Sequence, residues 1–147
     1  MSAKSSTARI LVAEDNAQGA ELLEAYLADT GYEVNTAADG DSTLRLVREW
    51  KPDLVLLDIM LPRISGFEIC KRLKTDPATH NVAVIMVTAL DQPSDVEKAV
   101  EAGTNDFLTK PINKSELLLR IRAMLAHRHG SELPDTIDYI NAVQEGK

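Results

Sequence analysis

Five polar side chains of chemically useful types each stand at the end of a short apolar run. Glu14 and Asp15 come directly after the first run, and Asp58 follows the third. Thr88 closes the fourth run, and Lys110 follows the fifth. If these runs are strands of one parallel sheet, their carboxyl ends share one edge, where open α/β sheets bind ligands. Three carboxylates, one hydroxyl and one ammonium are then expected to meet at that edge.

Such a group of side chains suits phosphoryl chemistry that is assisted by a cation. Neighbouring carboxylates repel by roughly 4 kcal/mol per close pair near a protein surface, and a bound cation makes their closeness tolerable. Oxygen ligands beside a phosphate favour a hard ion, Mg²⁺ (or Mn²⁺). The Asp58 carboxylate could attack phosphorus and form an aspartyl phosphate. Lys110 would then neutralise the phosphoryl oxygens, and the Thr88 hydroxyl could donate to one of them.

The elements that must position these residues alternate regularly along the chain. The strand-like runs are Ile10–Ala13, Glu33–Ala37, Leu54–Leu57, Val82–Val87 and Asn105–Leu108. Between them, apolar residues recur every three to four positions, as in amphipathic helices. This alternation predicts an α/β fold: a doubly wound, five-stranded parallel sheet with helices on both faces, as in flavodoxin-like proteins. The second run is partly polar and suits an edge, so we expect the strand order 2-1-3-4-5.

Residues typical of helix ends separate the runs. Gly31 and Gly103 stand where a helix is expected to end in a left-handed residue. Three pairs have the spacing of a capping box and predict helix starts: Ser65 with Glu68, Ser94 with Glu97, and Asn113 with Glu116. Pro93 does not suit a start at Ser94, which leaves that boundary open by a residue or two.

The bulk composition excludes several classes of protein. A chain of 147 residues with 44% hydrophobic and 27% charged residues suits one folded domain. Its net charge of −7 argues against direct binding of nucleic acid, which needs a basic face. The single cysteine excludes an internal disulfide, and no apolar run reaches the roughly 18–20 residues of a membrane span. We therefore expect a cytoplasmic protein with no membrane partner.

Four sequence pieces at the expected strand ends form a larger pattern. They are Val12-Ala13-Glu14-Asp15-Asn16, Leu56-Leu57-Asp58-Ile59-Met60-Leu61-Pro62 with Gly66, Val87-Thr88-Ala89, and Asp106-Phe107-Leu108-Thr109-Lys110-Pro111. Together they resemble the response-regulator receiver family of two-component signalling, including its chemotaxis-regulator-like members. The resemblance implies a receiver domain over residues 9–127. A flexible segment, 1–8, would precede it, and a C-terminal tail, 128–147, would follow.

The resemblance also implies roles for the acids at the sheet edge. Asp58 would be the phosphorylated residue and, with Asp15, a direct ligand of the metal ion. Glu14 would hold the ion through water, and the backbone carbonyl of Met60 would complete the site. One departure is Ser65, where the family often has Asp or Asn.

A second set of roles concerns phosphate binding and the conformational switch. Lys110 would pair with the phosphoryl group, and its peptide bond to Pro111 would be cis. Thr88 would supply the switch hydroxyl, the backbone of Ala89 would contact the phosphate, and Phe107 would change rotamer. Thr88 as an ordinary strand residue and Phe107 as an ordinary core residue are the structural alternatives.

The function that the resemblance implies is a signalling switch. A sensor histidine kinase or phosphotransfer protein would supply the phosphoryl group, and an unidentified downstream protein or a homodimer would use the fourth-helix, fifth-strand and fifth-helix face. The chain would catalyse its own phosphorylation and dephosphorylation without being a conventional enzyme. We expect a stand-alone regulator; the alternatives are the receiver portion of a larger regulator and an aspartate-nucleophile phosphatase. The phosphatase is disfavoured because it needs a second acid at the position of Met60.

The C-terminal tail carries a pattern of its own. Leu133, Ile137, Ile140 and Val143, on either side of Pro134, are spaced as on one helical face. Such a helix would dock on its own domain, bind a partner or begin a linker. A disordered acidic end is the alternative.

Overall fold

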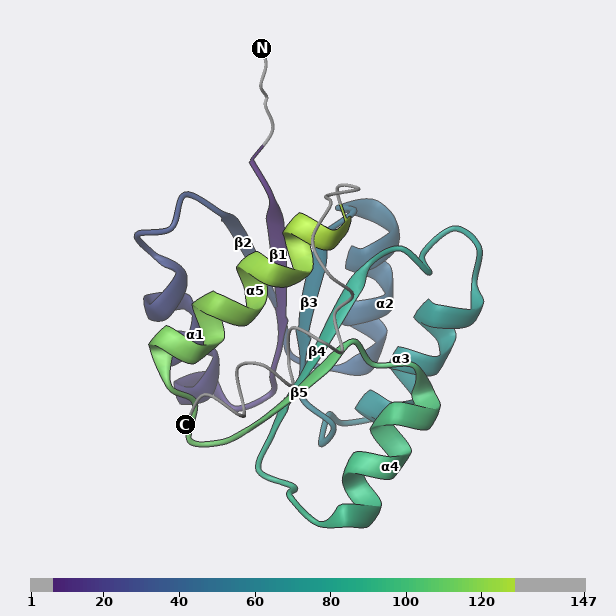
Figure 1. Ribbon diagram of the computed structural model, residues 1–147. Helices are drawn as coiled ribbons and strands as arrows, with labels where there is room; N and C mark the ends of the chain where they lie inside the picture. The colour runs from purple at the N-terminus through teal and green to yellow at the C-terminus, as the bar shows by residue number, and fades with distance from the viewer. Residues whose placement is uncertain (1–6, 129–147) are drawn as a thin grey trace.

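Within residues 7–128, which the computed structural model describes, five strands alternate with five helices (Figure 1). The elements are β1 (Arg9–Ala13), α1 (Ala17–Leu27), β2 (Glu33–Ala37), α2 (Gly40–Glu49), β3 (Leu54–Leu57), α3 (Gly66–Thr75), β4 (Ala83–Thr88), α4 (Pro93–Ala102), β5 (Asp106–Thr109) and α5 (Lys114–Arg128). Each predicted strand lies within one residue of an observed one. The expectations for most of the segment 1–8 and for residues 129–147 lie outside the described residues.

The strands form one parallel sheet in the order β2-β1-β3-β4-β5, which confirms the predicted topology. Every residue of β3 and β4 is buried, because both faces of these central strands are covered. Strand β2 lies at the edge and is largely accessible, as its polar residues indicated.

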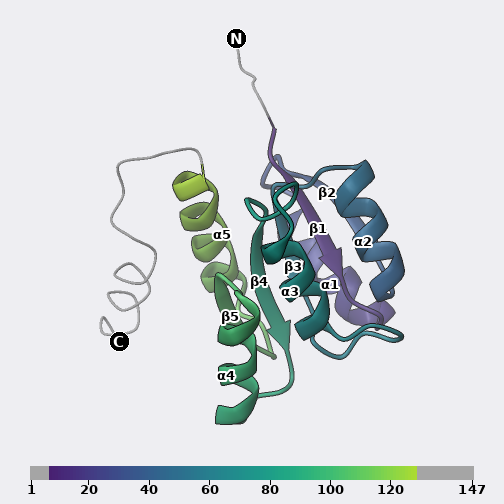
Figure 2. The ribbon, with the colours of Figure 1, turned by 90° about the vertical axis from the view of Figure 1, so that its right-hand side faces the viewer.

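Helices cover both faces of this sheet (Figure 2). Helices α1 and α5 pack with one set of inward side chains, including Leu23 and Ile121. Helices α2, α3 and α4 pack on the opposite face, where Val47, Ile69 and Ala99 contribute to a second apolar cluster. The parallel strands therefore deliver all their carboxyl ends to one edge between the two layers.

The helix boundaries follow local capping chemistry, with one correction. The Ser65 hydroxyl accepts a hydrogen bond from the Glu68 amide, and Asn113 caps α5 through the Glu116 amide. The predicted start at Ser94 is wrong, because α4 begins at Pro93 after Gln92. Proline suits a first helical position, where its missing N–H costs no intrahelical bond.

The two glycines expected at helix ends are both left-handed, but only one of them caps a helix. Gly103 ends α4 with a φ of 95°. Gly31, with a φ of 86°, lies in the turn before β2, since α1 already ends at Leu27 with a right-handed Ala28 after it. The left-handed turn at Gly31 therefore shapes the entry to β2 and not the end of α1.

Candidate functional site

Two buried carboxylates and one ammonium meet at the carboxyl edge of the sheet. The Nζ of Lys110 lies 2.5 Å from Glu14 Oε1 and 3.0 Å from Asp58 Oδ2. Glu14 is 4% exposed and Asp58 6%, although each is charged in the ordinary form of its side chain. These residues are 96 and 52 positions from Lys110 in the sequence, so only the parallel sheet brings them together.

Backbone amides hold the remaining oxygens of both carboxylates. Glu14 Oε2 accepts from the Asn16 amide at 3.2 Å, and Asp58 Oδ1 accepts from the Met60 amide at 3.0 Å. The Asp58 amide in turn donates to the carbonyl of Ala13, the last residue of β1. The acids are thus oriented by the strand ends themselves before any ligand binds.

Backbone contacts also position Lys110, from the end of β4. Its backbone amide donates to the Thr88 carbonyl at 2.8 Å, and the peptide bond from Lys110 to Pro111 is cis. Burial alone would lower the pKa of this lysine, but the hydrogen bonds that Lys110 donates to Glu14 and Asp58 outweigh burial and raise the pKa above its ordinary value. Lys110 therefore carries its charge throughout the physiological pH range.

Asp15 lies beside this group but takes no part in it. Its side chain is exposed, and among residues 7–128 it makes no hydrogen bond or ion pair. Within the same residues, no three acidic, histidine or cysteine side chains are close enough together to hold a metal ion by themselves. The expected meeting of three carboxylates is therefore realised by two of them, paired with Lys110.

The charges of these residues nevertheless suit a small divalent cation. Glu14, Asp15 and Asp58 carry three negative charges in their ordinary ionised forms, and Lys110 offsets one of them. Mg²⁺ needs only one or two carboxylates, because it keeps several water ligands. Asp15, Asp58 and the Met60 carbonyl are the oxygen donors at this edge that could hold such an ion.

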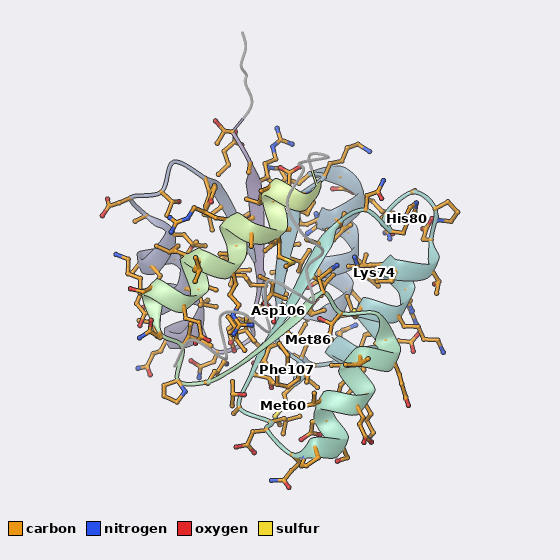
Figure 3. The ribbon with its side chains drawn as sticks, in the orientation of Figure 1. Met60, Lys74, His80, Met86, Asp106 and Phe107 are labelled. Atoms are coloured by element: carbon orange, nitrogen blue, oxygen red, sulfur yellow. The ribbon has the colours of Figure 1, made fainter. Side chains whose placement is uncertain are left out.

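The residues expected to form the switch lie on the last two strands. Thr88 is fully buried, and its Oγ1 accepts from the Leu90 amide at 3.3 Å. Phe107 on β5 is half-buried and packs against the cluster under α2, α3 and α4 (Figure 3). Ala89, which follows Thr88, is exposed. The structure thus places a buried hydroxyl on β4, the strand beside β3 and Asp58, and a half-buried ring on β5, one strand further out.

Sequence reasoning missed the structural role of Gly66, which lies where α3 begins against the loop of Asp58. A Cβ at this position would lie 2.4 Å from the Asp58 carbonyl oxygen and 2.6 Å from Ile59 Cα. The Gly66 amide donates to the Ile59 carbonyl at 2.8 Å. The start of α3 therefore presses directly on the loop that carries Asp58, and only glycine allows that approach.

A buried ion pair at the beginning of β5 was also missed. Arg120 of α5 donates to Asp106 Oδ1 at 2.7 Å and to Glu116 at 3.0 Å. The second Asp106 oxygen and the Arg120 Nε are buried without a partner among the described residues. This pair fastens the beginning of β5 to α5, next to Phe107.

Comparison with families of known proteins gives one match to a family model. The model of the response regulator receiver domain matches residues 10–122. This range includes the edge residues from Glu14 to Lys110. Among the residues that the structure describes, no helix has the length and apolar character needed to cross a membrane.

Curated relatives agree with the match to the receiver-domain model. Response regulator PleD of Caulobacter vibrioides is 44% identical over 118 residues, which are 80% of this chain and 26% of PleD. RpaA of Synechocystis, named a DNA-binding dual master transcriptional regulator, is 36% identical over 94% of this chain and 56% of its own. The DNA-binding response regulator MtrA of Mycobacterium tuberculosis is 41% identical over 80% of this chain and 50% of its own. This chain thus spans between about a quarter and just over half the length of these relatives.

Two solved structures share the fold over most of their length. A response regulator from Chloroflexus aurantiacus has a TM-score of 0.79 and 36% identity, and the match covers 82% of this chain and 99% of that one. A CheY-like receiver domain protein from Methanospirillum hungatei has a TM-score of 0.80 and 27% identity, over 85% of this chain and 98% of that one.

Proposed function

The chain belongs to the response regulator receiver domain family, and on that premise we propose that it is a phosphorylation-dependent switch in which Asp58 accepts a phosphoryl group. Receiver domains are signalling domains of two-component systems. The observation that carries the proposal is the ion pair of Asp58 with Lys110, 52 residues away, at the carboxyl edge of the sheet. A buried carboxylate with an ammonium beside it combines a nucleophile with a charge that would stabilise the transferring oxygens.

The donor would be the phosphohistidine of a sensor kinase or phosphotransfer protein. An Asp58 carboxylate oxygen attacks phosphorus, a P–O bond forms, and the P–N bond of the donor breaks. The imidazole leaves with the electron pair and takes up a proton, while Asp58 becomes an acyl phosphate. Lys110, which already contacts Asp58, then pairs with the new phosphoryl oxygens.

The proposal includes a divalent cation, Mg²⁺ or Mn²⁺. Asp15, Asp58 and the carbonyl of Met60 would hold the ion, and Glu14 would reach it through water. When bound, it would neutralise negative charge on the phosphoryl oxygens. The excess negative charge of the edge residues supports this assignment. Lys110 alone cannot balance three acids.

Phosphorylation would be transmitted through the last two strands. The Thr88 hydroxyl and the Ala89 backbone would turn toward the phosphoryl oxygens, and Phe107 would move into the space that Thr88 leaves. The face formed by α4, β5 and α5 would then favour another partner, either a downstream protein or a second copy of the chain. Converting such a switch from mostly off to mostly on needs roughly 5 kcal/mol of differential interaction.

Residues 9–127 would form the receiver, with 1–8 and 128–147 outside it. We propose that it acts in the cytoplasm through protein–protein contacts and without direct contact to nucleic acid. The relatives named as DNA-binding are much longer than the stretch they share with this chain. A stand-alone regulator and the receiver part of a longer protein are both consistent with the site.

Intact-mass measurement tests the assignment of Asp58. The wild type is incubated with acetyl phosphate and Mg²⁺ beside Asp58→Asn and the matched control Asp41→Asn, which changes an exposed acid of α2. We expect one added phosphoryl group in the wild type and in Asp41→Asn, and none in Asp58→Asn. Equal labelling of Asp58→Asn would remove Asp58 from the mechanism.

A further inference from the structure

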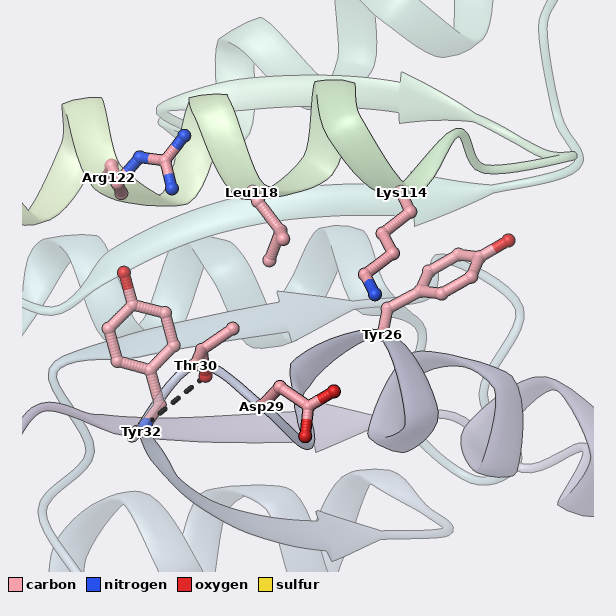
Figure 4. Close-up of a pocket in the computed structure, with 7 residues that line it drawn as sticks. All are labelled: Tyr26, Asp29, Thr30, Tyr32, Lys114, Leu118 and Arg122. Carbon is pink, nitrogen blue, oxygen red and sulfur yellow. Dashed lines mark hydrogen bonds between the residues drawn. The ribbon is translucent and has the colours of Figure 1, made fainter.

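A cavity of about 340 Å³ lies between α1 and α5, away from the proposed phosphorylation site (Figure 4). One wall is the face of α5 that carries Lys114, Leu118 and Arg122, four residues apart. Tyr26, Asp29 and Tyr32 belong to the opposite wall, at the end of α1 and in the turn before β2. We call this cavity the α1–α5 groove. Its volume lies at the lower end of the ~300–1,000 Å³ typical of ligand pockets.

The walls of the α1–α5 groove are held by hydrogen bonds of their own. The Tyr26 hydroxyl donates to the Ile112 carbonyl at 3.1 Å. The Thr30 hydroxyl donates to the Leu27 carbonyl and accepts from the Tyr32 amide, the dashed line in Figure 4. The groove is therefore formed before anything enters it.

The charges along the groove are not balanced within the part of the chain that the structure describes. There, Lys114 and Arg122 make neither an ion pair nor a side-chain hydrogen bond, and Asp29 is the one acid that lines the groove. Burial raises the pKa of Tyr32 against the opposing effect of Arg122, so this phenol stays neutral. Lys114 and Arg122 thus flank the half-buried Leu118. The rings of Tyr26 and Tyr32 lie opposite. This pattern suits a segment with acidic and aliphatic side chains.

The chain itself contains such a segment beyond α5. Residues 131–146 include four acids and no lysine or arginine: Glu132, Asp135, Asp138 and Glu145. Leu133, Ile137 and Ile140 are spaced as on one helical face. We propose that residues 131–146 dock in the α1–α5 groove. Their acids pair with Lys114 and Arg122, and their aliphatic side chains cover Leu118 and the two tyrosines.

The connection is long enough for this docking. The helical rise places Leu118 about 15 Å from Arg128, the last residue of α5. The nine residues from Arg128 to Ile137 can span up to about 30 Å when extended. The segment can therefore turn back along α5 and bring Ile137 to Leu118. This inference is independent of the phosphorylation site, because none of its residues contacts Asp58.

Paramagnetic broadening in the full chain tests the docking. A spin label is attached at Ala142→Cys, while Cys70 stays unlabelled because it is fully buried. We expect amide signals of residues 26–32 and 114–122 to lose intensity. Signals of α2 and α3 should keep theirs. Raising the salt from 0.1 to 1 M shortens the Debye length from about 10 to about 3 Å and should reduce the loss.

Charge reversal supplies the matched comparison. Lys114→Glu with Arg122→Glu should abolish the broadening, and Asp135→Lys with Asp138→Lys in that background should restore it. The control pair, Lys71→Glu with Lys98→Glu on the α3–α4 side, should leave the broadening unchanged.

Three results would overturn the proposal. The first is broadening that is absent from the groove or lies elsewhere. The second is broadening that persists after reversal at Lys114 and Arg122 in a protein whose spectrum shows it folded. The third is broadening seen between molecules, when a spin-labelled chain is mixed with an isotope-labelled chain lacking the label. That result would make the occupant a second copy.

Discussion

Replacing Lys110 with Met would remove the ammonium between two buried carboxylates. Glu14 and Asp58 contact the same nitrogen, at 2.5 and 3.0 Å, so their oxygens are no more than about 5.5 Å apart. At an effective dielectric of about 20, two unit charges at that distance repel by about 3 kcal/mol. Breaking a fully buried ion pair costs about 3–5 kcal/mol. Because the Lys110 side chain is 29% exposed and water can enter, we expect a loss of about 2–4 kcal/mol.

Urea unfolding followed by the fluorescence of Trp50, the single tryptophan, measures this loss. Lys71→Met is the matched control, since it removes an exposed cation on α3 and should cost less than about 0.5 kcal/mol. Adding Asp58→Asn to Lys110→Met should recover most of the stability, because a single carboxylate then remains in the pair. Millimolar Mg²⁺ should stabilise Lys110→Met more than it stabilises that double variant.

The pH dependence gives a second check on the same ion pair. The pKa of Lys110 is raised on folding, so its contribution to stability is complete below its unfolded pKa of about 10.5. It is lost as the pH rises through the higher folded-state pKa. The wild type should therefore lose more stability than Lys110→Met above pH 10.5. Equal stability of Lys110→Met and Lys71→Met, or an equal effect of Asp58→Asn in the wild-type and Lys110→Met backgrounds, would refute the ion pair's contribution to stability.

Three further parts of the fold yield predictions of their own. Gly66→Ala should destabilise the fold by about 2 kcal/mol or more despite alanine's better helix propensity, because its Cβ would meet the Asp58 backbone oxygen at 2.4 Å. Urea unfolding measures this loss, and an unchanged free energy of unfolding would contradict the close approach. Arg120→Met should lower the free energy of unfolding by about 3–5 kcal/mol, because it leaves the buried Asp106 unpaired. Adding Asp106→Asn should recover part of this loss in urea unfolding. Losses from the two substitutions that simply add would argue against the ion pair. Burial raises the pKa of the Cys70 thiol to about 11. Iodoacetamide at pH 8 should therefore modify Cys70 only as fast as the chain unfolds. Rapid alkylation of the folded protein, measured by mass, would show that the thiol is accessible.

The parts of the fold that could be predicted from the sequence are those set by local patterns. The apolar run Leu54–Leu57 has no polar interruption, which only a strand covered on both faces tolerates, and it is β3. Helix starts at Ser65 and Asn113 follow from one side-chain hydrogen bond each. The start at Ser94 failed because two local signals competed, and the preference of proline for the first helical turn prevailed over a serine cap.

Features that depend on how distant elements pack could not be predicted in this way. The ion pair of Asp106 with Arg120 requires the angle at which α5 crosses β5, which no residue spacing encodes. The close approach of Gly66 to the Asp58 backbone depends on where α3 packs against the sheet. The exposure of Asp15, beside the buried Glu14, depends on side-chain directions at the end of β1. The roles of these acids in binding a metal ion and a phosphoryl group stay predictions.

Mapping the site of phosphorylation tests the central claim most directly. After treatment with acetyl phosphate and Mg²⁺, borohydride would reduce an aspartyl phosphate to homoserine, and fragmentation of the tryptic peptide 49–63 would locate it. This step is needed because the peptide contains both Asp53 and Asp58. We predict homoserine at position 58 alone, and none when a chelator removes the metal ion. Homoserine at Asp53 or at an acid outside the edge, or its formation without a divalent cation, would contradict the account.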